Sequence, residues 1–120
     1  DIRILPKPGH DISIWVGGSS DSAFDRACAR GDGYHGTGVA PEDASALVDR
    51  IRRRRPEETF TISLRVPWDA KRVTPEDIAI QRETYEAAGV QHVVAAPERG
   101  DLEAWLSGME MIAEALRLIG

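Results

Sequence analysis

A short apolar stretch that ends in two glycines and two serines is the clearest candidate for chemistry in this chain. Ile12–Val16 is rich in β-branched and aromatic residues, and a helical pattern starts at Asp21. Glycines let a backbone approach a ligand closely, and the first turn of a helix offers N–H groups that lack intrahelical partners. This arrangement is typical of sites for anionic groups. The residues that could hold the anion are Gly17, Gly18, Ser19 and Ser20.

The same four residues also fit an ordinary strand-to-helix turn, in which Ser19 or Ser20 caps the helix and no ligand binds. A glycine-rich turn alone is a weak signature. Two glycines exceed what a cap requires, so the sequence favours the anion site.

A second glycine-rich segment, Gly33–Gly38, holds further candidates. Its first three residues predict a very short strand, and its last three predict a flexible loop. Thr37 is the best hydrogen-bond donor of that loop, and Gly36 or Gly38 could add a backbone N–H group. His35 could neutralise part of a phosphate charge. A solvent-exposed loop with a glycine hinge is the equally supported alternative.

Charged residues follow the two later strands that the sequence predicts, Phe60–Val66 and Val90–Ala96. The carboxyl ends of parallel strands are the face on which barrel enzymes place their active sites. Solvated loop charges and one packed tryptophan are the favoured interpretation of the first group, whereas Arg99 is a candidate anion contact. These residues are Arg65, Trp68, Lys71 and Arg72 at or after the carboxyl end of the first strand, and Glu98 and Arg99 after the second.

Metal and hydrolase chemistry find no support in the sequence. The three histidines are far apart and show no metal-ligand spacing. No G-x-S-x-G nucleophile motif is present. His92 is expected to be a packed or edge residue, and Cys28 a buried apolar one. A single cysteine cannot form an internal disulfide, which fits a reducing, cytoplasmic compartment.

Length and composition predict one globular unit. The chain has 120 residues, 42% hydrophobic and 29% charged, with a formal net charge of −5. This charge argues against a general nucleic-acid binder, and no apolar run approaches the roughly 20 residues that span a bilayer. No secretory leader is expected. A start at Asp1 without methionine suggests a processed chain or a fragment of a longer one.

Strand and helix patterns alternate along the whole chain, in the order β-α-β-α-β-α-β-α. Pro41 opens the second helix, whose end is marked by Arg52–Arg55 and Pro56. Four cations there complement the helix dipole, which is a simpler interpretation than a nucleic-acid patch. Thr74 and Asp101 are expected to cap the last two helices. The order predicts parallel strands joined by helices, either in an open sheet or in part of a barrel.

The last strand and the apolar side of the last helix are both expected to be buried. Val90–Ala96 is apolar nearly throughout, which suits a strand that is buried on both sides. The last helix carries a continuous apolar stripe that is expected to face the core rather than a cofactor: Leu102, Trp105, Leu106, Met109, Ile112, Ala113 and Leu116.

Several of these segments together resemble the luciferase-like oxidoreductases, a family of flavin- or deazaflavin-dependent (β/α)8 barrels. The resemblance covers about Ile12 to Leu116, in order and spacing, and is carried by Ile14–Ser19, Ala23, Arg26-Ala27, Gly31–Tyr34, Tyr85–Val90, His92–Val94, Trp105 and Met109. It implies that this chain is the C-terminal half of such a barrel, because a (β/α)8 barrel typically needs about 250 residues. The whole chain 1–120 would then be a single partial domain with four β-α units.

The resemblance also implies the ligands. Gly17–Ser20 would hold the phosphate tail of FMN or of a deazaflavin coenzyme, and the loop around Thr37 would lie against the same tail. Many relatives place a basic residue in that loop, whereas Val39 and Ala40 stand here, so the choice between the two cofactors stays open. The reaction would be monooxygenation or hydride transfer on a small molecule. The catalytic residues would lie outside this chain.

Half a barrel has two open strand edges, which invite pairing with another chain. The sequence therefore predicts a homo-oligomer, or pairing with a missing N-terminal half. Two other functions fit the same pattern: a non-redox enzyme that binds phosphate on a similar barrel, and a non-catalytic half-barrel that serves binding or assembly.

Overall fold

The structure is a computed structural model that describes residues 8–97 and 100–117. Strands and α-helices alternate along it, and one turn of 3-10 helix, η1 (Pro41–Asp43), precedes the second α-helix. The elements are β1 (Trp15–Gly17), α1 (Asp21–Arg30), β2 (Gly33–Thr37), α2 (Ala44–Arg54), β3 (Thr61–Val66), α3 (Pro75–Ala87), β4 (His92–Ala95) and α4 (Leu102–Arg117).

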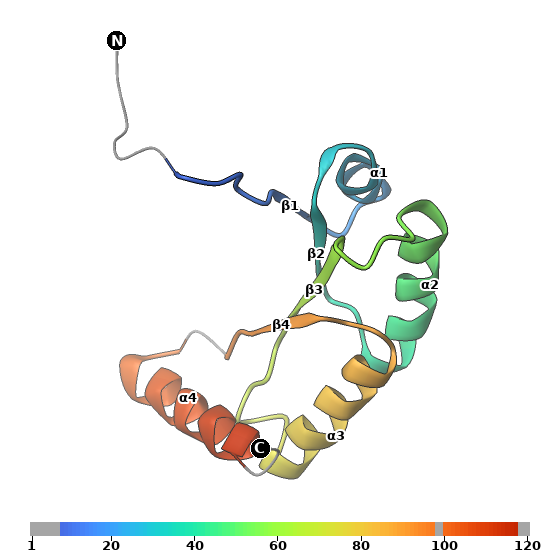
Figure 1. Cartoon of the computed structure of the whole chain (residues 1–120). Coiled ribbons are helices and arrows are strands. Elements are labelled where there is room, and N and C mark those ends of the chain that lie inside the picture. The colour runs from blue at the N-terminus through green and yellow to red at the C-terminus, as the bar shows by residue number, and fades with distance from the viewer. Residues whose placement is uncertain (1–7, 98–99, 118–120) are drawn as a thin grey trace.

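The four strands form one parallel sheet in the order β1-β2-β3-β4. In Figure 1, α1, α2 and α3 follow one side of the curved row of strands. Sequential order with helices on one side is the winding of a (β/α)8 barrel, whereas a doubly wound open sheet carries helices on both faces. The fold is therefore α/β with four β-α units, consistent with half of a TIM barrel.

Strand register divides the side chains between two faces of the sheet. Gly17, His35, Ser63 and His92 are partners in one row across all four strands. Because successive side chains alternate, this row and the rows two residues away lie on one face, which we call the inner face. The other face, toward the helices, is the outer face.

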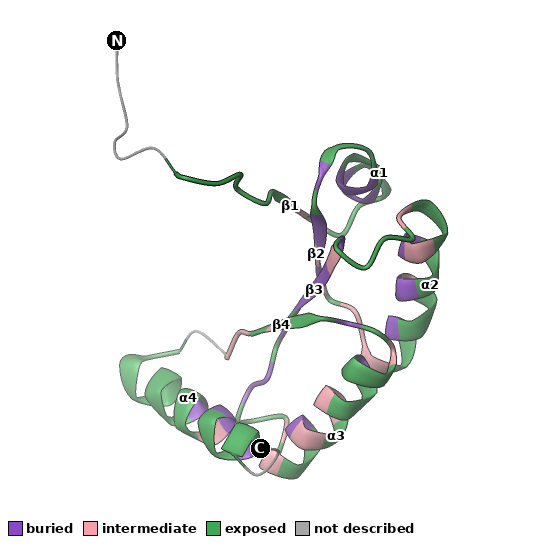
Figure 2. Cartoon of the chain, in the orientation of Figure 1, coloured by how far each residue is buried: buried purple, intermediate pink, exposed green. Residues whose placement is uncertain are grey.

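The core lies on the outer face. Ile62, Leu64 and Val66 of β3 and Tyr34 of β2 are buried there. Each helix buries a narrow stripe of side chains, as the purple segments of Figure 2 show. The helical members of the core cluster are Phe24, Ala27 and Cys28 of α1, Ala44, Val48 and Ile51 of α2, Ile78 and Tyr85 of α3, and Ile112 and Ala115 of α4. Cys28 is buried and free, as the sequence predicts.

The predicted helix caps are confirmed. Ser20 accepts from the N–H of Ala23 at the start of α1. Thr74 and Asp77 form a reciprocal capping box at α3, and Asp101 accepts from the N–H of Ala104 at α4. Each bond satisfies one of the N–H groups that a helix start leaves without a partner.

The arginines at the end of α2 bind within the chain. Arg52 donates to the carbonyl oxygens of Glu57 and Phe60, at 2.8 and 3.1 Å. Arg55 reaches the last turn of α1, where it donates to the carbonyl oxygens of Cys28 and Gly31. These contacts satisfy carbonyl groups at helix and loop ends, which supports the structural interpretation of this run over a nucleic-acid patch.

Two strand boundaries differ from the prediction. β1 begins at Trp15 rather than Ile12, because the ladder with β2 starts at the pair Trp15 and Gly33; Ile12 and Ile14 are exposed. β2 continues to Thr37, where a loop was expected. The extension follows from pairing of Gly36 and Thr37 with Leu64 and Arg65 of β3.

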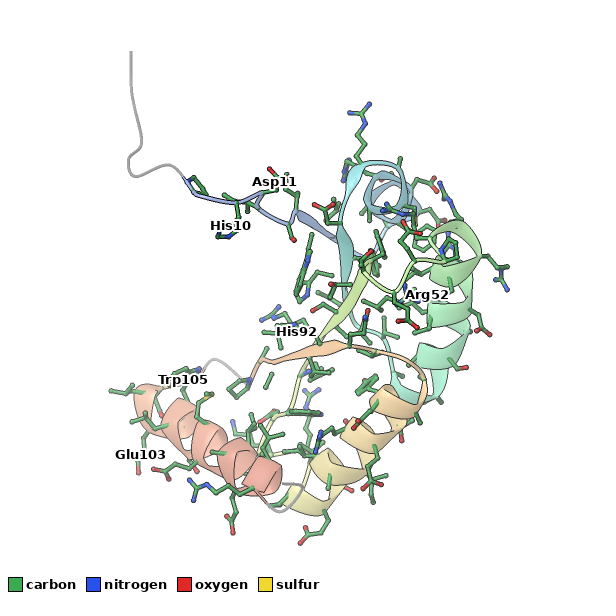
Figure 3. All side chains as sticks on the ribbon, viewed as in Figure 1. His10, Asp11, Arg52, His92, Glu103 and Trp105 are labelled. Atoms are coloured by element: carbon green, nitrogen blue, oxygen red, sulfur yellow. The ribbon has the colours of Figure 1, made fainter. Side chains whose placement is uncertain are left out.

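Two predicted core faces are wrong. β4 spans only His92–Ala95 and alternates between exposed and half-buried residues, so neither of its faces is fully covered within the described residues. On α4, Ile112 is buried, but Trp105, Leu106, Met109 and Leu116 are exposed. Figure 3 shows Trp105 on the part of α4 that is far from α3. Within the described residues no helix is long and apolar enough to cross a membrane.

Replacement of a core isoleucine tests this assignment of faces. Ile62 is fully buried on the outer face, whereas Ile80 of α3 is 62% exposed. We expect Ile62→Ala to lower the free energy of unfolding by about 2–5 kcal/mol, through lost burial and the cavity it leaves. Ile80→Ala should change it by less than about 0.5 kcal/mol. Urea unfolding of both variants measures the difference, and equal effects would contradict the burial pattern.

Candidate functional site

All four strands run in the same direction, so their carboxyl ends meet at one edge of the sheet. Gly17, Thr37, Val66 and Ala95 are the last residues of the strands there. In barrels and in open α/β sheets this is the edge at which ligands bind. The turn predicted to hold an anion, Gly17–Ser20, starts at this edge.

Gly18 fixes the shape of that turn. Its φ is +138°, and a Cβ atom built on it would lie 2.7 Å from the Cβ of Ala23 in α1. Its N–H donates to the carbonyl oxygen of His35 at 3.2 Å, and its carbonyl oxygen accepts from the Tyr34 hydroxyl at 2.7 Å. Burial raises the pKa of that hydroxyl above its ordinary value, so it stays protonated as the donor. Both polar atoms of Gly18 are thus bound to β2.

The two serines of the turn differ in whether their hydroxyl groups are already used within the fold. The Ser20 hydroxyl accepts from the Ala23 N–H and contacts the Ser22 hydroxyl at 3.0 Å, so it serves as the cap. Ser19 is exposed. Asp21, in the first turn of α1, places a carboxylate near the turn, but this carboxylate pairs with Arg50 of α2 at 2.8 Å.

Gly17 leaves an open space beside the turn. A Cβ atom built there would meet one atom within 4 Å, the carbonyl oxygen of His35 at 3.7 Å. A ligand can therefore approach the backbone of the turn from the inner side. The N–H groups of the first turn of α1 and the Ser19 hydroxyl are the donors that an anion would find there.

The other predicted contacts lie in different positions. Thr37 ends β2 on the inner face, half-buried, beside Arg65 of β3. Gly36 is buried on the outer face, where a side chain would meet Tyr34 and Leu64. Arg99 lies outside the described residues. Gly17 to Ser20 and Thr37 thus share the carboxyl edge, whereas Gly36 faces the helices.

The residues after β3 are a packed tryptophan and loop charges, as the favoured interpretation of the sequence expects. Trp68 is buried and its Nε1 donates to Gln81 of α3 at 3.0 Å. The guanidinium of Arg72 lies 3.7 Å from the Asp69 carboxylate, and its side chain is 81% exposed. Lys71 donates its backbone N–H to the same carboxylate.

A hydrogen-bonded chain that the sequence does not reveal crosses the inner face. The Ser63 hydroxyl lies 2.8 Å from Nδ1 of His35 and 2.9 Å from Nδ1 of His92. Ser63 is fully buried beneath the two rings. The three residues come from three strands, so only strand register brings them together. An alternation of serine and arginine inside an apolar strand was the one available signal.

The two rings hold different tautomers when both are neutral. A serine hydroxyl has one proton, so it donates to one Nδ1 and accepts from the N–H of the other. Burial lowers the pKa of His35 from its ordinary value, and the nearby His92 and Arg65 lower it further. The empty site therefore disfavours the positive charge on His35 that the sequence suggested.

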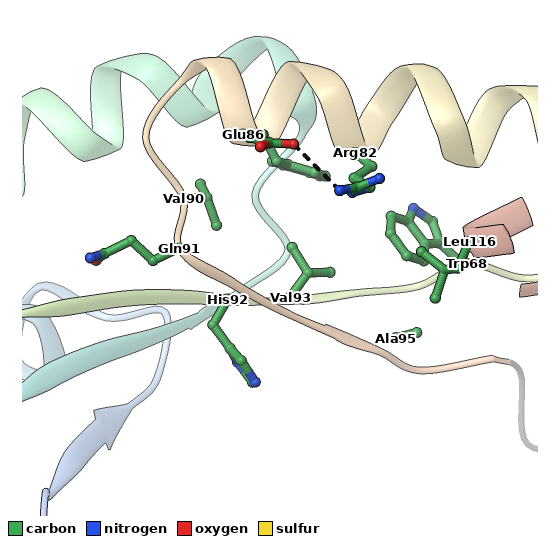
Figure 4. A pocket seen from close by; sticks show the side chains of 10 residues that line it. Trp68, Arg82, Glu86, Val90, Gln91, His92, Val93, Ala95 and Leu116 are labelled. Carbon is green, nitrogen blue, oxygen red and sulfur yellow. Dashed lines mark ion pairs between the residues drawn. The ribbon is translucent and has the colours of Figure 1, made fainter. Parts of the chain in front are cut away.

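Trp15 packs against one end of this hydrogen-bonded group, at His92. Its ring meets that of His92 edge to face, with the centroids 5.2 Å apart. Gly33 makes this possible, because a Cβ there would lie 2.8 Å from Cδ1 of Trp15. Figure 4 shows His92 on the opposite side of β4 from Arg82 and Glu86 of α3. The inner face thus has its own aromatic and polar lining.

A cavity of about 530 Å³ lies on the helix side of β4, between α3 and the end of α4. Val93, Ala95 and Trp68 line it, with the Arg82–Glu86 pair at its side (Figure 4). We attribute it to incomplete cover of β4, since α4 packs mainly against α3. No group of three His, Cys, Asp or Glu residues in the described part of the chain could hold a metal ion.

Comparison with known proteins agrees with this architecture. A family model described as luciferase-like monooxygenase matches residues 1–98. The chain belongs to this family. It is also 28% identical over 121 aligned positions to the uncharacterized proteins Rv0940c of Mycobacterium tuberculosis and Mb0965c of Mycobacterium bovis. The alignments cover 93% of this chain and 40% of each relative, so the chain spans two fifths of their length.

The tight turn gives a prediction about stability. Gly18→Ala adds a methyl group at a φ of +138° and 2.7 Å from Ala23, so we expect it to lower the free energy of unfolding by about 2–4 kcal/mol. Gly38→Ala is the matched control, because Gly38 also has a positive φ, +71°, but no atom within 4 Å. It should lower the free energy by only about 1 kcal/mol. Equal losses in urea unfolding would show that overlap with α1 does not matter.

Proposed function

We propose that this chain is the cofactor-phosphate-binding part of a flavin-type oxidoreductase of the luciferase-like family, and that it forms the C-terminal half of the barrel. The observation that carries the proposal is the turn Gly17–Ser20 at the carboxyl edge, with an open side at Gly17 and the start of α1 behind it. Family membership makes a flavin-type cofactor and a small-molecule substrate the expected ligands.

The donor set fits a phosphate group. In this proposal the first-turn N–H groups of α1 and the Ser19 hydroxyl hold the phosphate, and Thr37 adds a hydroxyl from β2. Arg50 offsets the charge of Asp21, the one carboxylate in the first turn of α1. Tyr34 and the carbonyl of His35 hold Gly18 in place, which keeps the turn ready for its ligand.

A bound flavin or deazaflavin supplies the redox chemistry itself, as hydride transfer or oxygen activation. The role of these residues would be to anchor the phosphate tail of the cofactor. Neither FMN nor a deazaflavin coenzyme is favoured by a particular contact, because both carry a phosphate in the tail.

A comparison of FMN with riboflavin tests the phosphate contact directly. The two flavins differ by the phosphate, so we expect this chain to bind FMN at least about tenfold more tightly, as charge-assisted hydrogen bonds require. Flavin fluorescence during titration measures both affinities. Gly17→Ala should bring the two affinities together, because the methyl group fits the fold but occupies the side from which the phosphate approaches.

Gly9→Ala is the matched control, since a methyl group at Gly9 meets nothing within 4 Å. It should leave the ratio of the two affinities unchanged. Circular dichroism of each variant confirms that the fold is retained. Equal binding of FMN and riboflavin by the unmodified chain, or a Gly17→Ala variant that keeps the preference, would refute this site.

We further propose that four more strands complete the sheet in the working protein, from a second copy or from an N-terminal half. Support comes from β1 and β4, each of which pairs with one strand within the described residues. Trp15 and Val94 are both 39% exposed on the inner face of these edge strands. Open edges and exposed apolar side chains favour strand addition.

Sedimentation velocity over a range of concentrations tests pairing between copies. We expect a monomer at low concentration and a dimer at high concentration, with slower hydrogen exchange at the amides of β1 and β4 in the dimer. Arg65 and Ser63 of the central strand serve as internal references. A monomer at every concentration would show that the edges do not pair between copies.

A further inference from the structure

The inner face differs in charge from the rest of the chain. The chain has 20 acidic and 15 basic residues. Arg65 is the only Asp, Glu, Lys or Arg residue within the four strands that the structure describes. Arg65 lies two residues after Ser63, so its side chain is on the inner face. It is on the carboxyl side of the row formed by His35, Ser63 and His92. The sheet therefore carries one fixed charge, and it is positive.

Two imidazole rings lie next to this charge, those of His35 and His92. Ser63 occupies Nδ1 of both His35 and His92, so Nε2 is the atom that each ring can offer to a ligand. An ion-pair partner for Arg65 is absent from the described residues, whereas Arg50, Arg54 and Arg55 each pair with a carboxylate.

We propose that Arg65 and the histidine pair form an oxyanion-binding site on the inner face, which takes a carboxylate or phosphoryl group of the substrate. A guanidinium binds such groups through parallel N–H donors. The Trp15 ring packs edge to face against His92 on the amino-end side of the site. The identification of the ligand as substrate rests on the proposed function, since the cofactor tail would occupy the turn Gly17–Ser20. The anion site itself does not depend on it.

Anion binding at this site is expected to be coupled to protonation of one of the two histidine rings. When both rings are neutral, one Nε2 carries a proton and the other does not. An oxyanion beside the bare Nε2 favours protonation of that ring. The hydrogen bonds of Ser63 stay as they are, because that ring already donates its Nδ1–H to Ser63 and the Ser63 hydroxyl already donates to the other ring. Arg65 and His92 oppose the charged form of His35 in the empty site, and the bound anion offsets both. Binding should therefore tighten as the pH falls through the range in which histidine titrates.

Sulfate is the probe of choice, because its charge does not change in that range. We expect the imidazole signals of His35 and His92 to shift saturably with sulfate in NMR spectra at constant ionic strength, and the pKa of His35 to rise. In Arg65→Gln the affinity should fall at least about tenfold, since a charge-assisted contact is lost. Arg65→Lys keeps the positive charge but lacks the parallel N–H donors of a guanidinium, so it should bind sulfate with intermediate affinity.

Arg72→Gln is the matched control, because Arg72 is an exposed arginine of the following loop. It should bind sulfate as the unmodified chain does. Shifts that do not saturate, or an equal loss in Arg72→Gln and Arg65→Gln, would mean general screening and would overturn the site. Affinity that does not change between about pH 8 and pH 6 would overturn the role of the histidines.

Gly17→Ala separates this site from the cofactor turn. The inner-face site predicts unchanged sulfate binding in this variant, even where the preference for FMN over riboflavin is lost. A variant that loses both would show a single anion site at the turn and would overturn the separate assignment. Loss of the FMN preference alone leaves the inner-face site standing, and loss of sulfate binding alone in Arg65→Gln leaves the cofactor turn standing.

Discussion

Burial of one face of a parallel sheet is the constraint on which this structure depends. Side chains of a strand alternate, so Ile62, Leu64 and Val66 can face the helices only if Ser63 and Arg65 face the other way. The outer face buries the apolar residues on which stability depends. The inner face is thereby free of that requirement, and it can carry the histidines, hydroxyls and the arginine. Stability and chemistry are divided between the two sides of the same strands.

The arginines of α2 show how neighbouring β-α units are held together. Arg55 joins α2 to the end of α1 through the carbonyl oxygens of Cys28 and Gly31, and its guanidinium also lies 4.4 Å from the centre of the Phe60 ring. Exposed ion pairs such as Arg50 with Asp21 contribute little to stability. The half-buried contact to helix-end carbonyls contributes more, because those groups would otherwise lack partners.

The sequence predicted those features that depend on interactions between residues close together in the chain. The caps at Ser20, Thr74 and Asp101 and the alternation of β3 depend on residues a few positions apart, so the sequence identified them. The exposure of Trp105 and Met109 was not predicted, because helical spacing shows which residues share a face but not what covers it. The contact of Ser63 with His35 and His92 joins residues 28 and 29 positions apart. Such a contact requires the register of three strands, which no short-range pattern contains.

The candidate anion turn and the inner face are connected through one strand. Gly18 is bound by its N–H to the carbonyl of His35 and by its carbonyl to the hydroxyl of Tyr34. Tyr34 faces the helices, and the ring of His35 faces Ser63. Two adjacent residues of β2 therefore fix the turn from the core side and the histidine pair from the inner side. Because hydrogen bonds at both points set the position of β2, the spacing between the two candidate sites is determined by the strand itself rather than by a loop.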